Sequence, residues 1–311
     1  MSYKILITSP GFAGSNPEPI ALLQAQGWEL EFNKTGTILE QEELKKRIAD
    51  AKGIILGTEP FGRNIIDAAT KLKAIARYGV GLDNIDLEYA RARGIQVRNA
   101  AGANSAAVAD TAFALMLAVS KKVLLLDKQV RQGDWTETLT YEINHKVLGL
   151  IGFGNIGAQA AKRAKGFEMK VIAYDTCQNT ELAKQHNTSF VDSMDEIFAQ
   201  SDIISLHIPH LPQTHHIIST REFAMMKSEA ILVNTARGGI VDEEALYAAL
   251  KNNSIRGAGF DVFEEEPLPI TSKLLKLENI VLSPHGAADT FESIYNVSMA
   301  CAKNMVSMLA E

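Results

Sequence analysis

The stretch "VLGLIGFGNIGAQAAKRAKGF", from Val147 to Phe167, places Gly152, Gly154 and Gly157 between an apolar run and an alanine-rich helical pattern. The apolar residues before Gly152 are typical of a buried strand, and the residues after Gly157 have the composition of a helix. Such a turn either holds the phosphates of a dinucleotide or is only a tight connection, because glycines also mark turns through their backbone freedom alone. The rest of the chain must distinguish these two interpretations.

The spacing of the three glycines fits the dinucleotide interpretation. Gly152 would make the turn, Gly154 would let the backbone approach the pyrophosphate, and Gly157 would pack the helix against the strand. The phosphates would accept hydrogen bonds from the backbone N–H groups of Asn155 and Ile156, at the positive end of the helix.

The next strand-like run, KVIAYD, supports this interpretation and indicates which dinucleotide binds. It ends at Asp175, roughly 20 residues after Gly152, where a carboxylate can accept hydrogen bonds from the ribose hydroxyls. Its charge would repel the 2′-phosphate of NADP, and residues 176–179 offer no arginine or lysine to reverse that preference. The sequence therefore predicts NAD as the cofactor.

Composition excludes several classes of protein. The chain has 311 residues, enough for about two domains, with 46% hydrophobic and 22% charged residues. Lys and Arg number 31 against 37 Asp and Glu, a net charge of −6, so no basic excess favours nucleic acid or an anionic membrane. We expect a small-molecule partner, with neither nucleic acid nor a membrane.

The N-terminus and the cysteines favour a cytoplasmic protein. MSYKILITSPGFAG lacks the long apolar stretch of a signal peptide, and the chain contains only Cys177 and Cys301, far apart. Four histidines occur in HIPHLPQTHH, His207 to His216, but without regular ligand spacing and without neighbouring carboxylates or cysteines. We expect no metal, and a loop beside the cofactor.

Short apolar runs alternate with helix-like stretches along the whole chain, and this alternation predicts parallel sheets with crossover helices. We expect an α/β fold of two parallel-sheet domains, Rossmann-like or flavodoxin-like, with a cleft between them. A helical pattern runs from Asn104 to about Val130, and another from Asp289 to Leu309. The second has no strand of its own, so we expect it to fold back on the first block.

Three polar residues follow strand-like runs in the second half of the chain: Arg237 in NTARGG, Glu266 in DVFEEEP and His285 in SPHGA. Because the carboxyl ends of parallel strands lie along one edge of a sheet, these side chains could converge on a ligand. Singly, they could be a surface ion-pair partner, part of a solvated acidic run and a buried structural histidine. With the glycine motif they indicate hydride transfer, which needs a cation for a carboxylate and an acid–base histidine held by a carboxylate.

These motifs, in this order and spacing, resemble those of the D-isomer-specific 2-hydroxyacid dehydrogenase family. The resemblance also covers YGVGLDNID from Tyr78 and GANSAAVAD from Gly102, and so extends over most of the chain. It implies that Arg237 orients the substrate, His285 donates or accepts the proton and Glu266 is its partner. It also implies substrate-carboxylate contacts by the backbone of Val80 and Gly81. Further implied cofactor contacts are His207, Pro209, Thr235, Ala236, Asp261, His285 and Ala287.

The resemblance implies the domain organisation and the assembly as well. The expected NAD-binding Rossmann domain is residues 102–287, inserted in a discontinuous substrate-binding domain made of residues 1–101 and 288–311. Enzymes of the family are usually dimers, and we expect a homodimer.

The family includes phosphoglycerate dehydrogenases, glyoxylate and hydroxypyruvate reductases and D-lactate dehydrogenases, so the chain is expected to be an NAD-dependent 2-keto acid reductase. Phosphoglycerate dehydrogenases often bring an arginine near the strand end that here reads ILGTEP, where Glu59 would oppose a phosphate and Arg63 could substitute. The alternatives are an NAD-sensing protein that resembles the corepressors of the family and has no turnover, and another hydride transfer such as phosphite oxidation. The 2-hydroxy acid and the reaction direction stay open.

Overall fold

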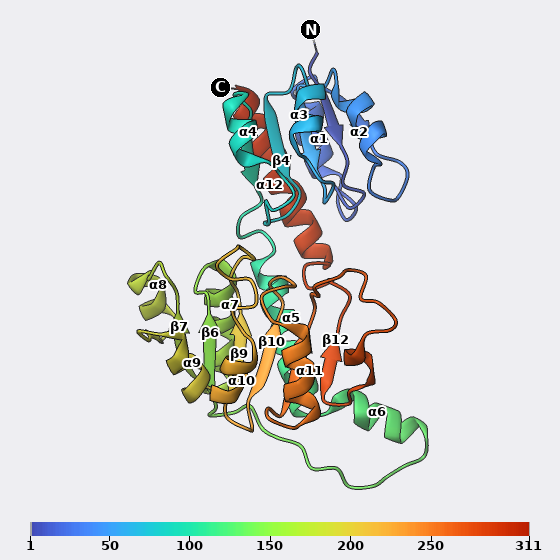
Figure 1. Cartoon of the computed structure of the whole chain (residues 1–311). Helices are drawn as coiled ribbons and strands as arrows, with labels where there is room; N and C mark the ends of the chain where they lie inside the picture. Colours follow the sequence, from blue (N-terminus) through green and yellow to red (C-terminus); the bar gives the residue numbers. More distant parts are fainter. Residues whose placement is uncertain (1, 311) are drawn as a thin grey trace. The chain divides into compact units, whose positions relative to one another are not determined.

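The computed structural model describes residues 2–310 and divides them into two compact units (Figure 1). The first unit takes in the described residues up to Asn104 and those from Ala288 onward, and the second is Ser105–Ala287. Each unit contains one parallel sheet covered by helices. The expected α/β fold with two parallel sheets is therefore confirmed.

The first unit has five strands in the order β2-β1-β3-β4-β5, all parallel. Its strands are β1 (Lys4–Ile7), β2 (Glu29–Phe32), β3 (Gly53–Leu56), β4 (Ala74–Arg77) and β5 (Gln96–Asn99). Its helices are α1 (Glu18–Gln24), α2 (Gln41–Ile48), α3 (Arg63–Ala68), α4 (Leu87–Ala92) and α12 (Phe291–Ala310).

Both faces of this sheet are buried, which explains why its strands are apolar without alternation. Successive side chains point to opposite faces: Leu6 packs with α2, α3 and α4, whereas Ile5 and Ile7 pack with α1 and α12. Cys301 and Met305 of α12 are fully buried in the second cluster. The predicted return of the final helix to the first block is confirmed.

The second unit has seven parallel strands in the order β12-β11-β10-β9-β6-β7-β8. The strands are β6 (Val147–Ile151), β7 (Lys170–Tyr174), β8 (Thr188–Phe190), β9 (Ile203–Leu206), β10 (Ile231–Asn234), β11 (Gly257–Phe260) and β12 (Ile280–Leu282). The helices are α5 (Ser105–Ser120), α6 (Val123–Arg131), α7 (Asn155–Ala164), α8 (Thr180–Gln185), α9 (Met194–Gln200), α10 (Thr220–Met225) and α11 (Glu243–Lys251), with 3₁₀ turns at Lys165–Phe167 and Lys273–Lys276.

The predicted helix from Asn104 to Val130 is wrong in one respect, because the structure divides it into α5 and α6. Lys122 has a φ of 49°, in the left-handed region, and this residue interrupts the helical hydrogen bonding. The apolar pattern continues across the break, so hydropathy alone did not reveal it. No residue of α6 is buried, and the chain after it returns to β6 as a long segment without helix or strand (Figure 1).

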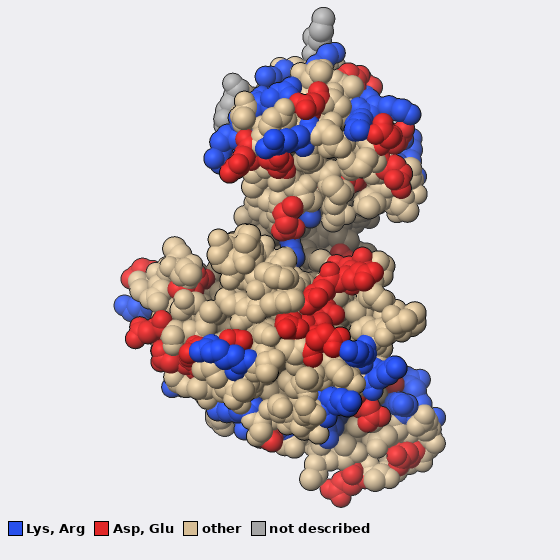
Figure 2. Space-filling model, in the orientation of Figure 1, with Lys and Arg blue, Asp and Glu red and all other residues tan. Residues whose placement is uncertain are grey.

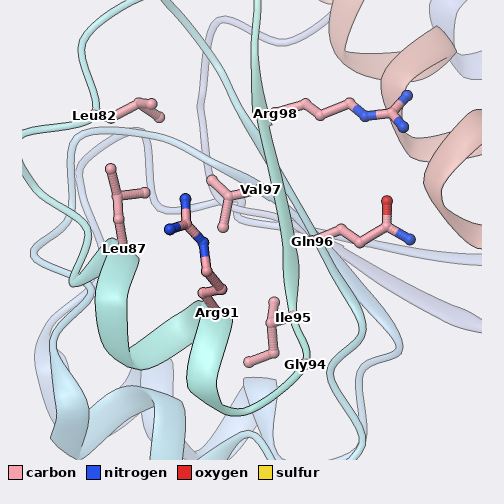
Figure 3. Close-up of a pocket in the computed structure, with 8 residues that line it drawn as sticks. All are labelled: Leu82, Leu87, Arg91, Gly94, Ile95, Gln96, Val97 and Arg98. Atoms are coloured by element: carbon pink, nitrogen blue, oxygen red, sulfur yellow. The ribbon is translucent and has the colours of Figure 1, made fainter.

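A pocket of about 530 Å³ lies beside the edge strand β5 of the first unit (Figure 3). Arg91 and Leu87 of α4 and Val97 of β5 point into it, whereas Gln96 and Arg98 extend toward α12, where they contact Met308 and Ser307. None of the predicted site residues lines this pocket.

Charges are interspersed on the face of the first unit drawn in Figure 2, where basic and acidic side chains lie side by side.

Within residues 2–310, no helix combines the length and apolarity that crossing a bilayer requires.

The packing of α5 on β11 leaves no room for a side chain at Gly259. A Cβ atom there would lie 2.7 Å from the Cβ of Leu115 in α5, which is attached directly to the backbone and cannot rotate away. We expect Gly259→Ala to lower the free energy of unfolding by about 1–3 kcal/mol, because helix and strand must separate. Urea unfolding measures this loss. Gly166→Ala, where nothing lies within 4 Å, is the control, and equal stability of both variants would contradict the packing argument.

Candidate active site

Parallel pairing brings the loops with the predicted site residues to one edge of the second sheet. The strand order changes direction between the neighbouring strands β6 and β9, and open α/β sheets bind their ligands at the carboxyl ends of two such strands. The glycine turn follows β6, and His207 follows β9. The structure therefore places the glycine turn at the position where open α/β sheets bind their ligands.

The glycine turn has no space for side chains at two of its positions and open space at the third. Gly152 has a φ of 96°, and a Cβ there would lie 2.5 Å from the carbonyl oxygen of His207. A Cβ at Gly157 would collide with the carbonyl oxygen of Gly152, which fixes the close packing of α7 on the turn. Nothing lies within 4 Å of the Cβ position at Gly154. This arrangement fits a turn whose open side receives a phosphate group.

Asp175 stabilises the same turn from the end of β7. Its carboxylate accepts hydrogen bonds from the backbone N–H of Phe153 (2.7 Å) and of Cys177 (2.8 Å). The N–H groups of Asn155 and Ile156 belong to the first turn of α7 and have no acceptor inside the helix. A negatively charged group of a ligand would supply the hydrogen-bond acceptors that these N–H groups lack inside the helix.

Two polar side chains at this edge are buried without partners. Among the residues that the structure describes, neither ring nitrogen of His207 has a hydrogen-bond partner, and the hydroxyl of Thr235 after β10 has none either. The ring nitrogens are inaccessible although the residue as a whole is half-buried, and burial lowers the pKa of His207 to about 4. His207 is therefore neutral near pH 7, with one nitrogen able to donate and the other able to accept. Unsatisfied groups of this kind fit a site completed by a polar ligand.

His285 and Glu266 form a close pair. Nδ1 of His285 lies 2.6 Å from Oε2 of Glu266, while Oε1 of Glu266 accepts a hydrogen bond from the backbone N–H of Phe263 (2.9 Å). The carboxylate therefore fixes the ring orientation and favours a proton on Nδ1, which leaves Nε2 to exchange a proton with a ligand. His285 is about half exposed, so its ring is accessible.

Asp261, which follows β11, organises the loop that carries His285. Its carboxylate is fully buried and accepts hydrogen bonds from the Ser283 hydroxyl (2.6 Å) and from the N–H groups of Gly286 (3.0 Å) and Ala287 (2.9 Å). Its backbone carbonyl accepts from the N–H of His285 (2.7 Å). These contacts hold His285 at a φ of 53°, which is strained for a residue with a Cβ. The sequence suggested only a cofactor contact for Asp261 and missed this positioning role.

The loop that contains Arg237 packs against the loop that contains Glu266. Asn234, buried at the end of β10, donates to the carbonyl of Arg237 (2.9 Å) and accepts from the N–H of Ala236 (3.0 Å). The next residue, Gly238, lies so close to the carbonyl of Phe263 that a Cβ would collide with it. The two loops thus pack together. The polar residue that ends the apolar run ILVN was the sequence signal for Asn234.

Val80 and Gly81 belong to the first unit, in the loop after β4. Neither of their N–H groups has an acceptor among the residues that the structure describes, and the carbonyl of Val80 accepts from the Asn99 side chain (2.5 Å). Two free N–H groups in one anchored loop are a suitable arrangement for binding a carboxylate.

Three of the four histidines of HIPHLPQTHH have side-chain partners within the protein. His210 and His215 are hydrogen-bonded to each other (3.1 Å), and His216 binds Glu264 (2.9 Å). In residues 2–310, no group of three or more His, Cys, Asp or Glu side chains has the arrangement of a metal site.

Comparison with known proteins shows to which family the chain belongs. Residues 113–287 match the model of the D-isomer specific 2-hydroxyacid dehydrogenase NAD binding domain. The chain is 39% identical to the glyoxylate reductase of Korarchaeum cryptofilum over 90% of this chain and 86% of that protein. It is 40% identical to the D-3-phosphoglycerate dehydrogenase of Archaeoglobus fulgidus, over 98% of this chain but only 57% of that longer protein.

The structure also resembles that of the D-lactate dehydrogenase of Aquifex aeolicus, solved with NAD and lactic acid. The TM-score is 0.84 with 28% identity, over 99% of this chain and 95% of that one. The chain therefore belongs to the D-isomer-specific 2-hydroxyacid dehydrogenase family, and residues 113–287 are its NAD-binding domain.

Proposed function

We propose that the protein catalyses the NAD(H)-dependent interconversion of a small 2-keto acid and its D-2-hydroxy acid, with glyoxylate or hydroxypyruvate as the keto acid. The observation that carries this proposal is the His285–Glu266 pair, 2.6 Å apart, at the same sheet edge as the glycine turn. The names of the relatives, glyoxylate reductase and hydroxypyruvate reductase among them, support the substrate class.

The cofactor would supply or accept the hydride at the carbon that carries the oxygen. The turn with Gly152, Gly154 and Gly157 receives its pyrophosphate, and Asn155 and Ile156 donate their N–H groups. Asp175 binds the ribose hydroxyls, because two backbone donors leave its carboxylate oxygens with lone pairs free. Contacts with the cofactor are also assigned to His207, Pro209, Thr235, Ala236, Asp261, His285 and Ala287.

In the reducing direction, His285 donates a proton from Nε2 to the carbonyl oxygen, so that negative charge does not accumulate there. Glu266 stabilises the imidazolium before this step and holds the ring in place. General acid catalysis of this kind contributes about 10²- to 10⁴-fold to the rate.

Two groups bind the substrate carboxylate in this proposal. Arg237 offers a planar guanidinium, which suits a carboxylate and polarises the neighbouring carbonyl. Val80 and Gly81 offer their free N–H groups from the first unit, which is accordingly assigned as the substrate-binding domain. The alternative of an NAD sensor without turnover does not require the complete set of Arg237, Glu266 and His285, so this set favours an enzyme.

The first test is an NADH oxidation assay with glyoxylate and hydroxypyruvate. We expect the wild-type protein to turn over at least one of them, and His285→Ala to keep NADH affinity within threefold while turnover falls about 10²- to 10⁴-fold. NADH affinity is measured by fluorescence titration, and His186→Ala, a change in the loop after α8, is the control. Unchanged turnover in His285→Ala would overturn the acid–base assignment, and NADH binding with no turnover by the wild type would favour the sensor.

A second test concerns cofactor preference. Asp175→Ala removes the carboxylate that repels a 2′-phosphate, so the ratio of kcat/KM with NADH to kcat/KM with NADPH should fall by at least tenfold. The Asp175→Asn variant, which can still accept one hydrogen bond from a ribose hydroxyl, should lie between alanine and the wild type. A ratio that stays constant in both variants would contradict the assignment of Asp175 as the ribose-binding residue.

The protein is proposed to act as a cytoplasmic homodimer. Residues 123–141, which form α6 and the extended segment after it, carry a set of exposed hydrophobic side chains. They are Val123, Leu124, Val130, Trp135, Leu139 and Tyr141, with exposed fractions from 44% to 83%. Concentrated apolar exposure of this kind is typical of an interface, and a twofold axis would bury the same segment of both copies.

Sedimentation velocity tests this assembly. The double variant Trp135→Glu and Leu139→Glu should sediment as a monomer, because it places charge at the centre of the apolar set. The control is Ile270→Glu, which changes an equally exposed side chain outside the segment. A dimer that persists in the double variant would show that residues 123–141 are not the interface.

A further inference from the structure

The pocket beside β5 contains none of the residues assigned to the proposed reaction (Figure 3). Its volume of about 530 Å³ lies within the range of about 300–1,000 Å³ that is usual for small-molecule sites. It lies between α4 and β5, and β5 is the last strand of its sheet. A ligand in this pocket can therefore reach side chains and also the unpaired backbone groups of an edge strand.

Much of the pocket wall is apolar and accessible. Leu82, Leu87 and Val97 line it together with the buried Ile95. Leu87 is 38% exposed, and Leu82 and Val97 are half-buried. An apolar ligand would remove these side chains from water, which is favourable. The wall therefore fits a ligand with an apolar body.

Arg91 gives the pocket a positive charge. Its side chain points from α4 into the pocket and is exposed, so that a ligand can reach the guanidinium (Figure 3). Among the described residues, none forms an ion pair or a hydrogen bond with this guanidinium. The residues that line the pocket include no aspartate or glutamate, and the other arginine, Arg98, donates to Ser307 of α12. The charge of the pocket is therefore complementary to an anion.

The edge strand adds a backbone donor to this wall. The N–H of Gln96 donates to the carbonyl of Lys73 (2.9 Å), so the backbone groups of Gln96 face β4. Successive residues of a strand direct these groups to opposite edges, so the N–H and the carbonyl of Val97 face the open side. Guanidinium and N–H groups are both donors that suit a carboxylate.

The pocket is connected at two points to the loop that contains Val80 and Gly81. Leu82 lines the pocket and is the residue after Gly81. The side chain of Asn99, at the end of β5, donates to the carbonyl of Val80 (2.5 Å). A ligand that packs on Leu82 and on β5 would therefore restrain this loop from both attachments.

We propose that the pocket is a second small-molecule site, which binds a carboxylate with an apolar body and thereby strengthens the binding of the keto acid. The carboxylate binds Arg91, and the apolar body packs on Leu82 and Leu87. A loop that is already restrained loses less conformational entropy when the keto acid binds, so the KM for the keto acid falls. This effect rests on the proposed function, because it takes the substrate carboxylate to bind Val80 and Gly81.

Methyl NMR titration of the whole chain, with NADH bound, tests the site. The probe is 4-phenylbutanoate, and 4-phenylbutan-1-ol is the comparison ligand without a charge. We expect 4-phenylbutanoate to shift the methyl signals of Leu82, Leu87 and Val97. Its affinity should fall about tenfold in Arg91→Gln, to that of the alcohol, because a charge-assisted hydrogen bond is lost. Lys71→Gln, which removes an exposed charge of the same unit outside the pocket, is the control and should keep the wild-type affinity.

Steady-state kinetics with NADH and glyoxylate tests the effect on the substrate loop. Saturating 4-phenylbutanoate should lower the KM for glyoxylate about threefold or more and leave kcat unchanged. Leu87→Trp fills the pocket from an exposed position, so it should keep the basal kcat and KM and abolish both the methyl shifts and the effect of 4-phenylbutanoate on KM.

The outcomes against this inference are specific. Equal affinity for 4-phenylbutanoate in the wild type and Arg91→Gln would overturn the carboxylate site. A rise in KM that persists in Leu87→Trp would show that the probe competes at the substrate site, and would overturn the coupling. Methyl shifts that depend on protein concentration without any probe would show that a second copy of the chain occupies the pocket instead. Absence of turnover would overturn the proposed function, whereas the methyl signals would still decide whether this pocket binds a carboxylate.

Discussion

Parallel pairing in both sheets is the constraint on which the rest of the structure depends. Each strand ends at the same edge as its neighbours, so residues distant in sequence, such as Gly152, His207 and His285, emerge together. Crossover helices are needed to return the chain, and they cover both faces of each sheet. This cover explains why the strands are apolar throughout and why the chemistry is confined to the loops.

At this edge of the second sheet, the position of His285 depends on a series of contacts with neighbouring loops. Asp261 fixes residues 283–287, and Glu266 fixes both the His285 ring and the N–H of Phe263. Gly238 then allows the Arg237 loop to pack on the carbonyl of Phe263. Arg237, Glu266 and His285 are thus held in place by the contacts of Asp261, Phe263 and Gly238, and a change at any of these positions would move one of the three side chains.

Sequence patterns revealed the parts of the structure that depend on local spacing. The alternation of strands and helices predicted two parallel sheets, and the glycines near residue 152 predicted the turn at the change in strand order. The bend at Lys122 was missed, because it depends on one backbone angle inside a continuous apolar pattern. Burial of Glu59 and the three bonds to Asp261 were also missed, since they arise from contacts between segments more than 20 residues apart. Likewise, the sequence did not show that Gly238 would lie against the backbone carbonyl of Phe263.

The return of α12 to the first unit affects the order in which the protein can be completed on the ribosome. Met305 and Cys301 fill the core beneath β1 and β3, so the earliest sheet to be synthesised stays partly uncovered until residues 291–310 have emerged. The second unit has all of its strands once residue 282 is made. We therefore expect the second unit to fold before the first unit during synthesis, although the first unit contains the N-terminal strands. This order is the reverse of the usual one, in which N-terminal domains fold first.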